Sequence, residues 1–294
     1  MKIRVPATTA NMGPGFDCIG MALSLYNEVE VQVAETGEGL RIQASEGVPT
    51  GPDNLIYKTL CDFYREAGLP LPPLPLVQKD RIPMTRGLGS SAACVVAGLL
   101  AGNALAGTGL SREALIDQAA KIEGHPDNTT PALTGGLVVG VMDGARLSYI
   151  RIPPPTWERL RFALMVPAFE LSTEKARQAL PDAYPRRDVV HNTSRAALLV
   201  AALATGDFEK LAVALDDCVH QPYRLPLVPG MDAIFAEARN CGAYNAFLSG
   251  AGPALIAVTQ DDDFLPRMEA FLQSLPHRWD ICWIEPDHHG AMIL

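Results

Sequence analysis

The segment that most constrains this chain is Pro83–Ala93, PMTRGLGSSAA, which places two glycines and two serines at the start of the apolar run Ala92–Ala106. Glycines let a loop turn tightly and bring its backbone close to a ligand. A helix that begins at such a loop directs unpaired backbone N–H groups at an anion, which is usually a phosphate. The segment therefore predicts a phosphate-binding loop. A close-packed strand-to-helix turn capped by a serine is the simpler alternative.

Two better-known phosphate motifs fit this loop poorly. No Lys-Ser or Lys-Thr pair follows the glycines, so the segment is not a Walker A loop. Gly87-x-Gly89-x-x-Ala92 meets the loose dinucleotide pattern, but that pattern also needs a following strand that ends in an acidic residue. The sequence continues as a helix instead. A nicotinamide-dependent oxidoreductase is therefore the weakest interpretation.

The composition excludes several classes of protein. The chain has 294 residues, of which 48% are hydrophobic, and this length is enough for two modest domains or one large one. Its net charge is −9. No stripe of Lys and Arg with interleaved aromatic residues occurs, so we expect no nucleic acid partner. The N-terminus lacks an apolar signal-peptide core and the run Ala92–Gly102 is too short to span a bilayer, so we expect no membrane partner. Six scattered cysteines without a C-x-x-C pair predict reduced thiols and a cytoplasmic protein.

Hydrophobic periodicity predicts strands and helices in both halves of the chain. Three consecutive prolines at 153–155 fit neither a helix nor a central strand, so they mark the predicted domain boundary. We expect a two-domain α+β protein with domains at residues 1–152 and 156–294. The strands are expected at 26–34, 76–82, 137–142, 162–167 and 279–284, and the helices at 53–67, 92–106, 111–124, 189–204, 208–219, 231–241 and 264–275.

The segment Pro6–Gly20, PATTANMGPGFDCIG, is a candidate substrate pocket. Small residues and glycines surround one amide, Asn11, and one carboxylate, Asp17. A carboxylate in such a pocket can meet a hydroxyl or an amine. The alternative is a Gly/Pro loop in which both side chains satisfy their own backbone turns.

The segment EGHPDNTTP, which begins at Glu123, is a candidate cation and substrate site. Glu123 is expected to end a helix, where a carboxylate opposes the helix dipole, and this favours another role such as a cation ligand. Mg²⁺ prefers one or two carboxylates with hydroxyl, water and phosphate oxygens, and Ser90 or Ser91 can supply the hydroxyl. His125 and Asn128 lie in the same short loop, although an Asx-turn with a satisfied histidine is the simpler interpretation.

A fourth segment, Ser249–Pro253 (SGAGP), reads by itself as a hairpin turn or as a second loop packed against the first glycine-rich loop. In chain order, Pro6–Gly20, Pro83–Ala93, the segment that begins at Glu123 and SGAGP resemble the GHMP kinase superfamily, which includes galactokinase and the homoserine, mevalonate and phosphomevalonate kinases. PMTRGLGSSAA is similar to the superfamily's ATP-phosphate loop, and SGAGP is similar to its C-terminal glycine loop. Within the superfamily, PATTANMGPGFDCIGMAL, EGHPDN, HNTSRAALL and HQPYRLPLVPG resemble the homoserine kinase family.

The resemblance implies a fold, a reaction and its partners. The implied fold has an N-terminal domain like a ribosomal-protein domain, with a left-handed βαβ crossover, and a ferredoxin-like C-terminal domain. The implied reaction transfers a phosphoryl group from ATP, with Mg²⁺, to L-homoserine on the way to threonine, and a homodimer is favoured. Another GHMP kinase that acts on threonine, mevalonate or a sugar, and a catalytically silent ligand-binding member, are the alternatives.

The resemblance also suggests which residues bind the nucleotide and the metal. Mg²⁺ would bind Glu123 with Ser90 or Ser91. Thr173 and Arg177 are expected near the phosphates, and Asn54 near the nucleoside. The ATP phosphates would bind two glycine-rich loops, formed by Pro83, Met84, Thr85, Arg86, Gly87, Leu88, Gly89, Ser90, Ser91, Ala92 and Ala93 with Gly250 and Gly252.

The remaining polar residues are assigned to the substrate. Arg195 and Arg224 suit the substrate carboxylate, because a guanidinium pairs with it in bidentate geometry. Asp17 suits the ammonium group or the reacting hydroxyl. We expect Asp17, Asn128 and Arg195 to contribute to catalysis, without a firm general base. The hydroxyl would be oriented by Asn11 of the segment Pro6–Gly20 and by His125 and Asn128 of the segment that begins at Glu123.

Overall fold

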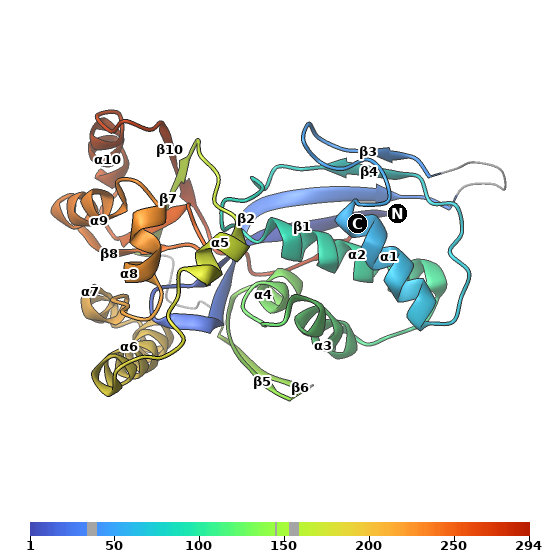
Figure 1. Ribbon diagram of the computed structural model, residues 1–294, viewed down its shortest axis with the longest axis horizontal. Coiled ribbons are helices and arrows are strands. Elements are labelled where there is room, and N and C mark those ends of the chain that lie inside the picture. Colours follow the sequence, from blue (N-terminus) through green and yellow to red (C-terminus); the bar gives the residue numbers. More distant parts are fainter. Residues whose placement is uncertain (34–39, 145, 153–158) are drawn as a thin grey trace.

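The computed structural model describes residues 1–33, 40–144, 146–152 and 159–294, so the prolines at 153–155 fall outside it. The chain builds two sheets side by side, each with its own helices (Figure 1). Among the described residues the first sheet has seven strands: β1 (Lys2–Asn11), β2 (Gly15–Val31), β3 (Ile42–Gln43), β4 (Leu76–Lys79), β5 (Leu137–Asp143), β6 (Arg146–Ile152) and β11 (Met292–Ile293).

The first sheet contains both ends of the chain. Its strand order is β11-β1-β2-β4-β3, and β5 pairs with β2 and with β6. The last strand, β11, runs antiparallel to β1 with Ile3 opposite Ile293. The two termini therefore lie close together in Figure 1. The predicted division into domains at residues 1–152 and 156–294 stays a prediction. After β10 the chain returns to the first sheet and adds β11 to it.

The second sheet is antiparallel with the order β10-β7-β9-β8, formed by β7 (Arg161–Pro167), β8 (Ala243–Leu248), β9 (Leu255–Thr259) and β10 (Trp279–Ile284). Helices connect β7 to β8 and β9 to β10, which gives the ferredoxin-like arrangement that we expected. Both faces of this sheet are buried, since Phe162 and Leu164 of β7 join one core and Ala163 and Met165 join another. This double burial explains why β7 reads as a continuous apolar run.

The central helix of the first half is α2, Ser90–Ala106, and it is buried as its composition predicts. It packs against β1 and against three helices, α1, α3 and α4. A Cβ atom at Gly98 would lie 2.6 Å from Thr59, so α1 and α2 approach at a place where only glycine fits. The helix is capped by Gly89 with φ 68° and no side-chain hydrogen bond, so the serine cap of the simpler alternative is wrong.

The predicted helices are present with one exception, and the short helices α4 (Thr129–Thr134), α5 (Thr173–Gln178) and α8 (Gln221–Arg224) were not predicted. The expected helix at 208–219 is interrupted, because the Asp217 carboxylate accepts hydrogen bonds from the backbone of Val219, His220 and Gln221 and starts a new helix. None of the helices in the described residues is long and apolar enough to cross a membrane. The remaining helices are α1 (Leu55–Glu66), α3 (Arg112–Glu123), α4 (Thr129–Thr134), α5 (Thr173–Gln178), α6 (Arg186–Thr205), η2 (Phe208–Lys210), α7 (Leu211–Ala214), α8 (Gln221–Arg224), η3 (Leu225–Leu227), α9 (Met231–Asn240) and α10 (Phe264–Leu272).

The first predicted pocket segment forms strands instead of a loop. Within Pro6–Gly20, only residues 12–14 turn between β1 and β2. The second half of β1 is buried at every position, so its small residues show no alternation of polar and apolar side chains. Strand periodicity fails where both faces of a strand are covered.

Candidate active site

One cleft of about 790 Å³, including its open mouth, collects residues from all four predicted segments. Helices α5 and α8 of the second half also line it. Of the predicted site residues, the cleft brings together Asn11, Asp17, Pro83, Thr85, Arg86, Gly87, Leu88, Gly89, Ser90, Ser91, Ala92, Glu123, His125, Asn128, Arg224 and Gly250. The lining formed by the described residues does not include Met84, Ala93, Arg195 or Gly252.

The floor of the cleft is the glycine-rich loop that leads into α2. Gly87 and Gly89 have φ angles of 73° and 68°, in the left-handed region that favours glycine. A Cβ atom at Gly89 would lie 2.0 Å from Oγ1 of Thr8, and one at Gly87 would lie 2.1 Å from the carbonyl oxygen of Ser249. The N–H groups in the first turn of α2 have no partner inside the helix and lie at its positive end. The loop therefore has the geometry of an anion site.

The second glycine-rich loop is bound to the first. Ser249 Oγ donates to the carbonyl oxygen of Gly87 at 2.7 Å. The carbonyl oxygen of Gly250 accepts hydrogen bonds from Asn11 Nδ2 at 2.8 Å and from Arg224 Nη1 at 3.0 Å. These contacts fix the two loops, the end of β1 and α8 relative to one another.

The Arg86 side chain does not have the geometry of a phosphate ligand. Its Nε donates to the carbonyl oxygen of Pro167 at 3.0 Å and its Nη2 to that of Ala168 at 2.9 Å, both at the end of β7. The third nitrogen, Nη1, donates to the carbonyl oxygen of Met84 at 3.2 Å. Because all three nitrogens bind protein oxygens, Arg86 fastens the phosphate loop to the second half of the chain.

Glu123 is the last residue of α3 and lines the same cleft as Ser90 and Ser91. No hydrogen bond or ion pair to its carboxylate occurs within the described part of the chain. Burial raises the pKa of Glu123 above its ordinary value, and the charge of Asp127 adds to this against the opposing effect of His125. A partly buried carboxylate without a partner is stabilised by a cation. Together with the serine hydroxyls it forms a set of hard oxygen donors that fits Mg²⁺.

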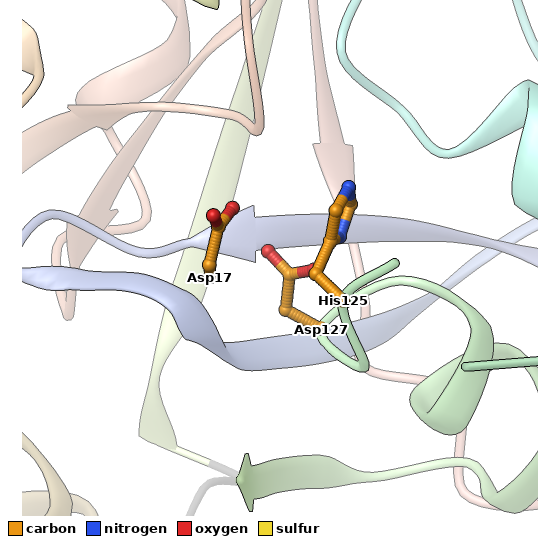
Figure 2. Close-up of side chains that lie close together, drawn as sticks. All are labelled: Asp17, His125 and Asp127. Carbon is orange, nitrogen blue, oxygen red and sulfur yellow. The ribbon is translucent and has the colours of Figure 1, made fainter. Parts of the chain in front are cut away.

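Three side chains, Asp17, His125 and Asp127, lie close together (Figure 2), and all three line the same cleft as Glu123. Their ligand atoms lie within 4.8 Å of one another. His125 Nδ1 pairs with the carboxylate of Asp127, which is 1% exposed. Burial disfavours the charged imidazole, but the hydrogen bond to Asp127 and the charges of Asp127 and Asp17 outweigh it and raise the pKa of His125. Asp127, which the sequence places in the same polar loop as His125 and Asn128, orients His125 through this contact.

Asp17 is paired with an arginine from the other half of the chain. Nη1 and Nη2 of Arg177 on α5 donate to the two carboxylate oxygens at 3.1 and 2.9 Å. The guanidinium of Arg224, 2% exposed, lies on the ring of Phe16 at 5.4 Å, and that of Arg177 lies at 5.8 Å from the same ring. Burial lowers the pKa of Arg224 to about 10, and the charge of Arg177 adds to this lowering, so Arg224 is still cationic at neutral pH.

Arg195 does not reach this site. It lies on α6, where its Nε pairs with the carboxylate of Asp216 at 3.4 Å and its Nη1 donates to the carbonyl oxygen of His191 at 3.3 Å. We expected Arg195 beside the substrate and Arg177 near the phosphates, and the structure instead places Arg177 next to Arg224. The local sequence does not show which arginine reaches the cleft, because each follows a short polar stretch, STEKA before Arg177 and HNTS before Arg195.

Three predicted amides, Asn11, Asn128 and Asn54, make hydrogen bonds within the protein itself. Asn11 Oδ1 accepts the N–H of Asp17 at 3.0 Å, which supports an aspartate whose φ of 56° is uncommon for a residue other than glycine. Asn128 Oδ1 accepts the hydroxyl of Thr8 at 2.8 Å. Asn54 caps α1 by accepting the N–H groups of residues 56 and 57, and the cleft lining does not include it.

Comparison with known proteins decides the family. The GHMP kinases N-terminal domain model matches residues 54–136, and the GHMP kinases C-terminal model matches residues 199–275. A homoserine kinase from Caldicellulosiruptor saccharolyticus is 43% identical over 300 residues, which cover 100% of this chain and 96% of that protein. The chain belongs to the homoserine kinase family of the GHMP kinases.

Two further members support this membership. A homoserine kinase from Synechococcus sp. is 44% identical over 284 residues, covering 95% of this chain and 90% of that protein. The crystal structure of homoserine kinase from Cytophaga hutchinsonii has a TM-score of 0.88 at 26% identity, covering 100% of this chain and 97% of that one. The predicted resemblance and the two-domain GHMP kinase fold are thereby confirmed, and the chain is an ATP-dependent kinase.

Proposed function

We propose that this chain transfers the γ-phosphoryl group of ATP to the side-chain hydroxyl of L-homoserine and forms O-phospho-L-homoserine, a step towards threonine. The names of its full-length relatives support this reaction. The observation that carries it is the ion pair between Asp17 and Arg177 beside Arg224, in the cleft that also holds the phosphate loop.

The charges in this part of the cleft match an amino acid. Asp17 offers one negative charge, and Arg177 and Arg224 offer two positive ones. The ammonium group of homoserine suits the Asp17 carboxylate, and its carboxylate suits the guanidinium groups, which form charge-assisted hydrogen bonds with such groups. A neutral sugar carries neither charge, and mevalonate carries only the carboxylate. Arg177 therefore takes the substrate-binding role that we predicted for Arg195.

The reacting groups meet near the first turn of α2. The N–H groups of the loop Gly87–Ala92 would hold the triphosphate at the positive end of the helix. Glu123 with Ser90 or Ser91 would hold Mg²⁺, which neutralises phosphate charge when bound. We assign no general base, because phosphoryl transfer depends more on positioning and charge neutralisation than on covalent help. The substrate hydroxyl would be oriented by His125 and Asn128.

The setting of the enzyme is also a proposal. Six free cysteines among the described residues support a cytoplasmic location, where thiols stay reduced. The resemblance to GHMP kinases supports a homodimer.

A coupled ADP-release assay with Mg-ATP tests the substrate. The panel contains L-homoserine, L-threonine, L-serine, mevalonate and galactose, with 3-aminopropan-1-ol and 4-hydroxybutanoate as homoserine analogues that lack the carboxylate or the ammonium group. We expect turnover with homoserine far above that with either analogue. Turnover with mevalonate or galactose instead would overturn the assignment of Asp17 and the arginines, and silence across the panel would favour a ligand-binding protein.

A further inference from the structure

His220 precedes α8 and is completely buried, and the cleft lining does not include it. Its Nε2 lies 2.8 Å from the carbonyl oxygen of Gly13, in the turn between β1 and β2. Its Nδ1 lies 3.2 Å from Nη1 of Arg224. The imidazole therefore connects the β1–β2 turn to one of the arginines that line the cleft.

These two contacts define the protonation of the ring. A carbonyl oxygen can only accept a hydrogen bond, so Nε2 carries a hydrogen. A guanidinium can only donate, so Nδ1 must offer its lone pair to Arg224. The ring is therefore neutral. Burial lowers the pKa of His220 and the charge of Arg224 lowers it further, against the opposing effect of Asp217, which agrees with this form.

The contacts of Arg224 leave one edge of its guanidinium for a ligand. Nε donates to the carbonyl oxygen of Ala176 at 3.2 Å, and the two Nη1 hydrogens reach the carbonyl oxygen of Gly250 at 3.0 Å and Nδ1 of His220. In the described part of the structure Nη2 has no hydrogen-bond partner, and Arg224 lines the cleft. His220 is the side chain that completes the fixed orientation of the group.

We infer that His220 is a positioning residue for substrate recognition, because its hydrogen bond from Arg224 holds Nη2 towards the substrate carboxylate. This inference rests on the proposed function, since that carboxylate belongs to homoserine. A free arginine side chain has considerable rotamer entropy, so orienting it before binding lowers the cost of forming a directional pair. A histidine that merely filled space would need no acceptor at Nδ1.

Two amide variants separate the two contacts of His220. In His220→Asn the amide oxygen takes the place of Nδ1 and keeps the acceptor for Arg224, while the donor to Gly13 is lost. In His220→Gln the amide nitrogen reaches the place of Nε2 and keeps the contact to Gly13, while the acceptor at Nδ1 is lost. We expect His220→Gln to raise the KM for homoserine about tenfold, the order expected for one hydrogen bond to a charged group, and to leave the KM for ATP within about twofold.

The same measurement shows what would overturn the inference. We expect His220→Asn to keep a KM for homoserine near that of the unaltered protein, and His220→Gln to lose part of its preference for homoserine over 3-aminopropan-1-ol. If instead His220→Asn has the larger effect, the contact to Gly13 is what matters and the inference is wrong. Circular dichroism and melting temperatures of both variants establish that each is folded.

A matched control concerns the same turn. Asn192 on α6 donates to the carbonyl oxygen of Pro14 at 2.8 Å, next to Gly13, and in the described part of the chain it makes no hydrogen bond with Arg224. Asn192→Leu is expected to lower the melting temperature without a selective rise in the KM for homoserine. An equal rise in this variant and in His220→Gln would place the effect in the turn and overturn the role of Arg224.

A double-mutant cycle with Arg224→Met completes the test. If His220 acts through Arg224, then His220→Gln adds almost nothing to the KM for homoserine once Arg224 is replaced. Additive effects would overturn the inference. Turnover of homoserine by the unaltered protein tests the proposed function separately, so failure of the reaction and failure of the positioning role give different results.

Discussion

Arg177 and Asp17 form a bidentate ion pair that joins α5 to the start of β2, with N–O distances of 3.1 and 2.9 Å between residues 160 positions apart. The hydrogen bonds with Asp17 raise the pKa of Arg177, so the guanidinium is fully charged at any physiological pH. Both groups line the cleft. The pair thus presents both signs of charge to a substrate and connects the two halves of the chain.

The first prediction compares two arginines. We expect Arg177→Met to raise the KM for homoserine roughly 10- to 100-fold, the effect of losing a charge-assisted bidentate pair, with a small effect on the KM for ATP. Arg195→Met is the matched control, because Arg195 is also paired with an aspartate but lies outside the cleft. Steady-state kinetics of both variants check this. A larger rise for Arg195→Met would restore the original assignment.

A second prediction concerns the attachment of the phosphate loop through Arg86. Replacing Arg86 by Met leaves the carbonyl oxygens of Pro167 and Ala168 without their donor and frees the loop from the second half of the chain. We expect the KM for ATP to rise about tenfold and the melting temperature to fall, with the KM for homoserine changed less. Arg81→Met, at an exposed position just before the loop, is the control and should change neither. An unchanged KM for ATP in Arg86→Met would make this attachment irrelevant to the nucleotide.

Much of this site could be predicted because its signals are local. The glycines and serines before α2, and the apolar composition of α2 itself, predict a glycine-rich loop that leads into a buried helix without any knowledge of distant residues. Gly124 in the left-handed conformation ends α3 directly after Glu123, as the sequence predicts. Resemblance to a family was needed to expect that the four segments meet.

Other features depend on packing that the sequence does not display. Whether Arg177 or Arg195 reaches the cleft is decided by where α5 and α6 lie on the second half, and both arginines have similar polar neighbours. The strand β11 has two residues, too few for any periodicity, and forms because the chain end meets β1. Tertiary contacts override local propensity at such places.

A third prediction separates backbone strain from steric exclusion in the loop. Gly89 and Gly107 flank the same helix, α2, with φ angles of 68° and 64°. A Cβ atom at Gly89 would lie 2.0 Å from Thr8, whereas one at Gly107 would meet nothing within 4 Å. We expect Gly107→Ala to cost about 1–2 kcal/mol of stability and leave activity unchanged. Gly89→Ala should cost more stability and abolish measurable turnover. Denaturant unfolding of both variants measures the two losses of stability, and equal losses would contradict the steric argument.

The last prediction is that removing the charge of Glu123 harms catalysis and stabilises the fold. Without the carboxylate, Mg²⁺ loses its charged ligand, and we expect Glu123→Gln to lower kcat roughly 100-fold or more and to weaken the dependence on Mg²⁺. An unchanged Mg²⁺ titration would show that Glu123 does not bind the metal.

The stability effect follows from the direction of the pKa shift. Burial raises the pKa of Glu123 above 4.5, so the folded state binds the proton more tightly than the unfolded state does, and the ionised carboxylate destabilises the fold. At pH 7 Glu123→Gln should therefore melt at a higher temperature than the unaltered protein. The difference should narrow as the pH falls through the raised pKa and disappear below about 4.5, the ordinary value.

A matched variant isolates burial from the helix dipole. Glu66 is also the last residue of a helix, α1, but it is exposed. Glu66→Gln removes the same unfavourable interaction with a helix C-terminus and keeps an amide oxygen that can accept the hydrogen bond from Gln118 Nε2, so the stabilisation common to both variants measures the effect of the dipole. The further rise in the melting temperature of Glu123→Gln beyond that of Glu66→Gln then measures the cost of keeping a partly buried carboxylate in the cleft. A lower melting temperature for Glu123→Gln at pH 7 would contradict this account, because it would mean that the carboxylate stabilises the fold through a contact within the chain.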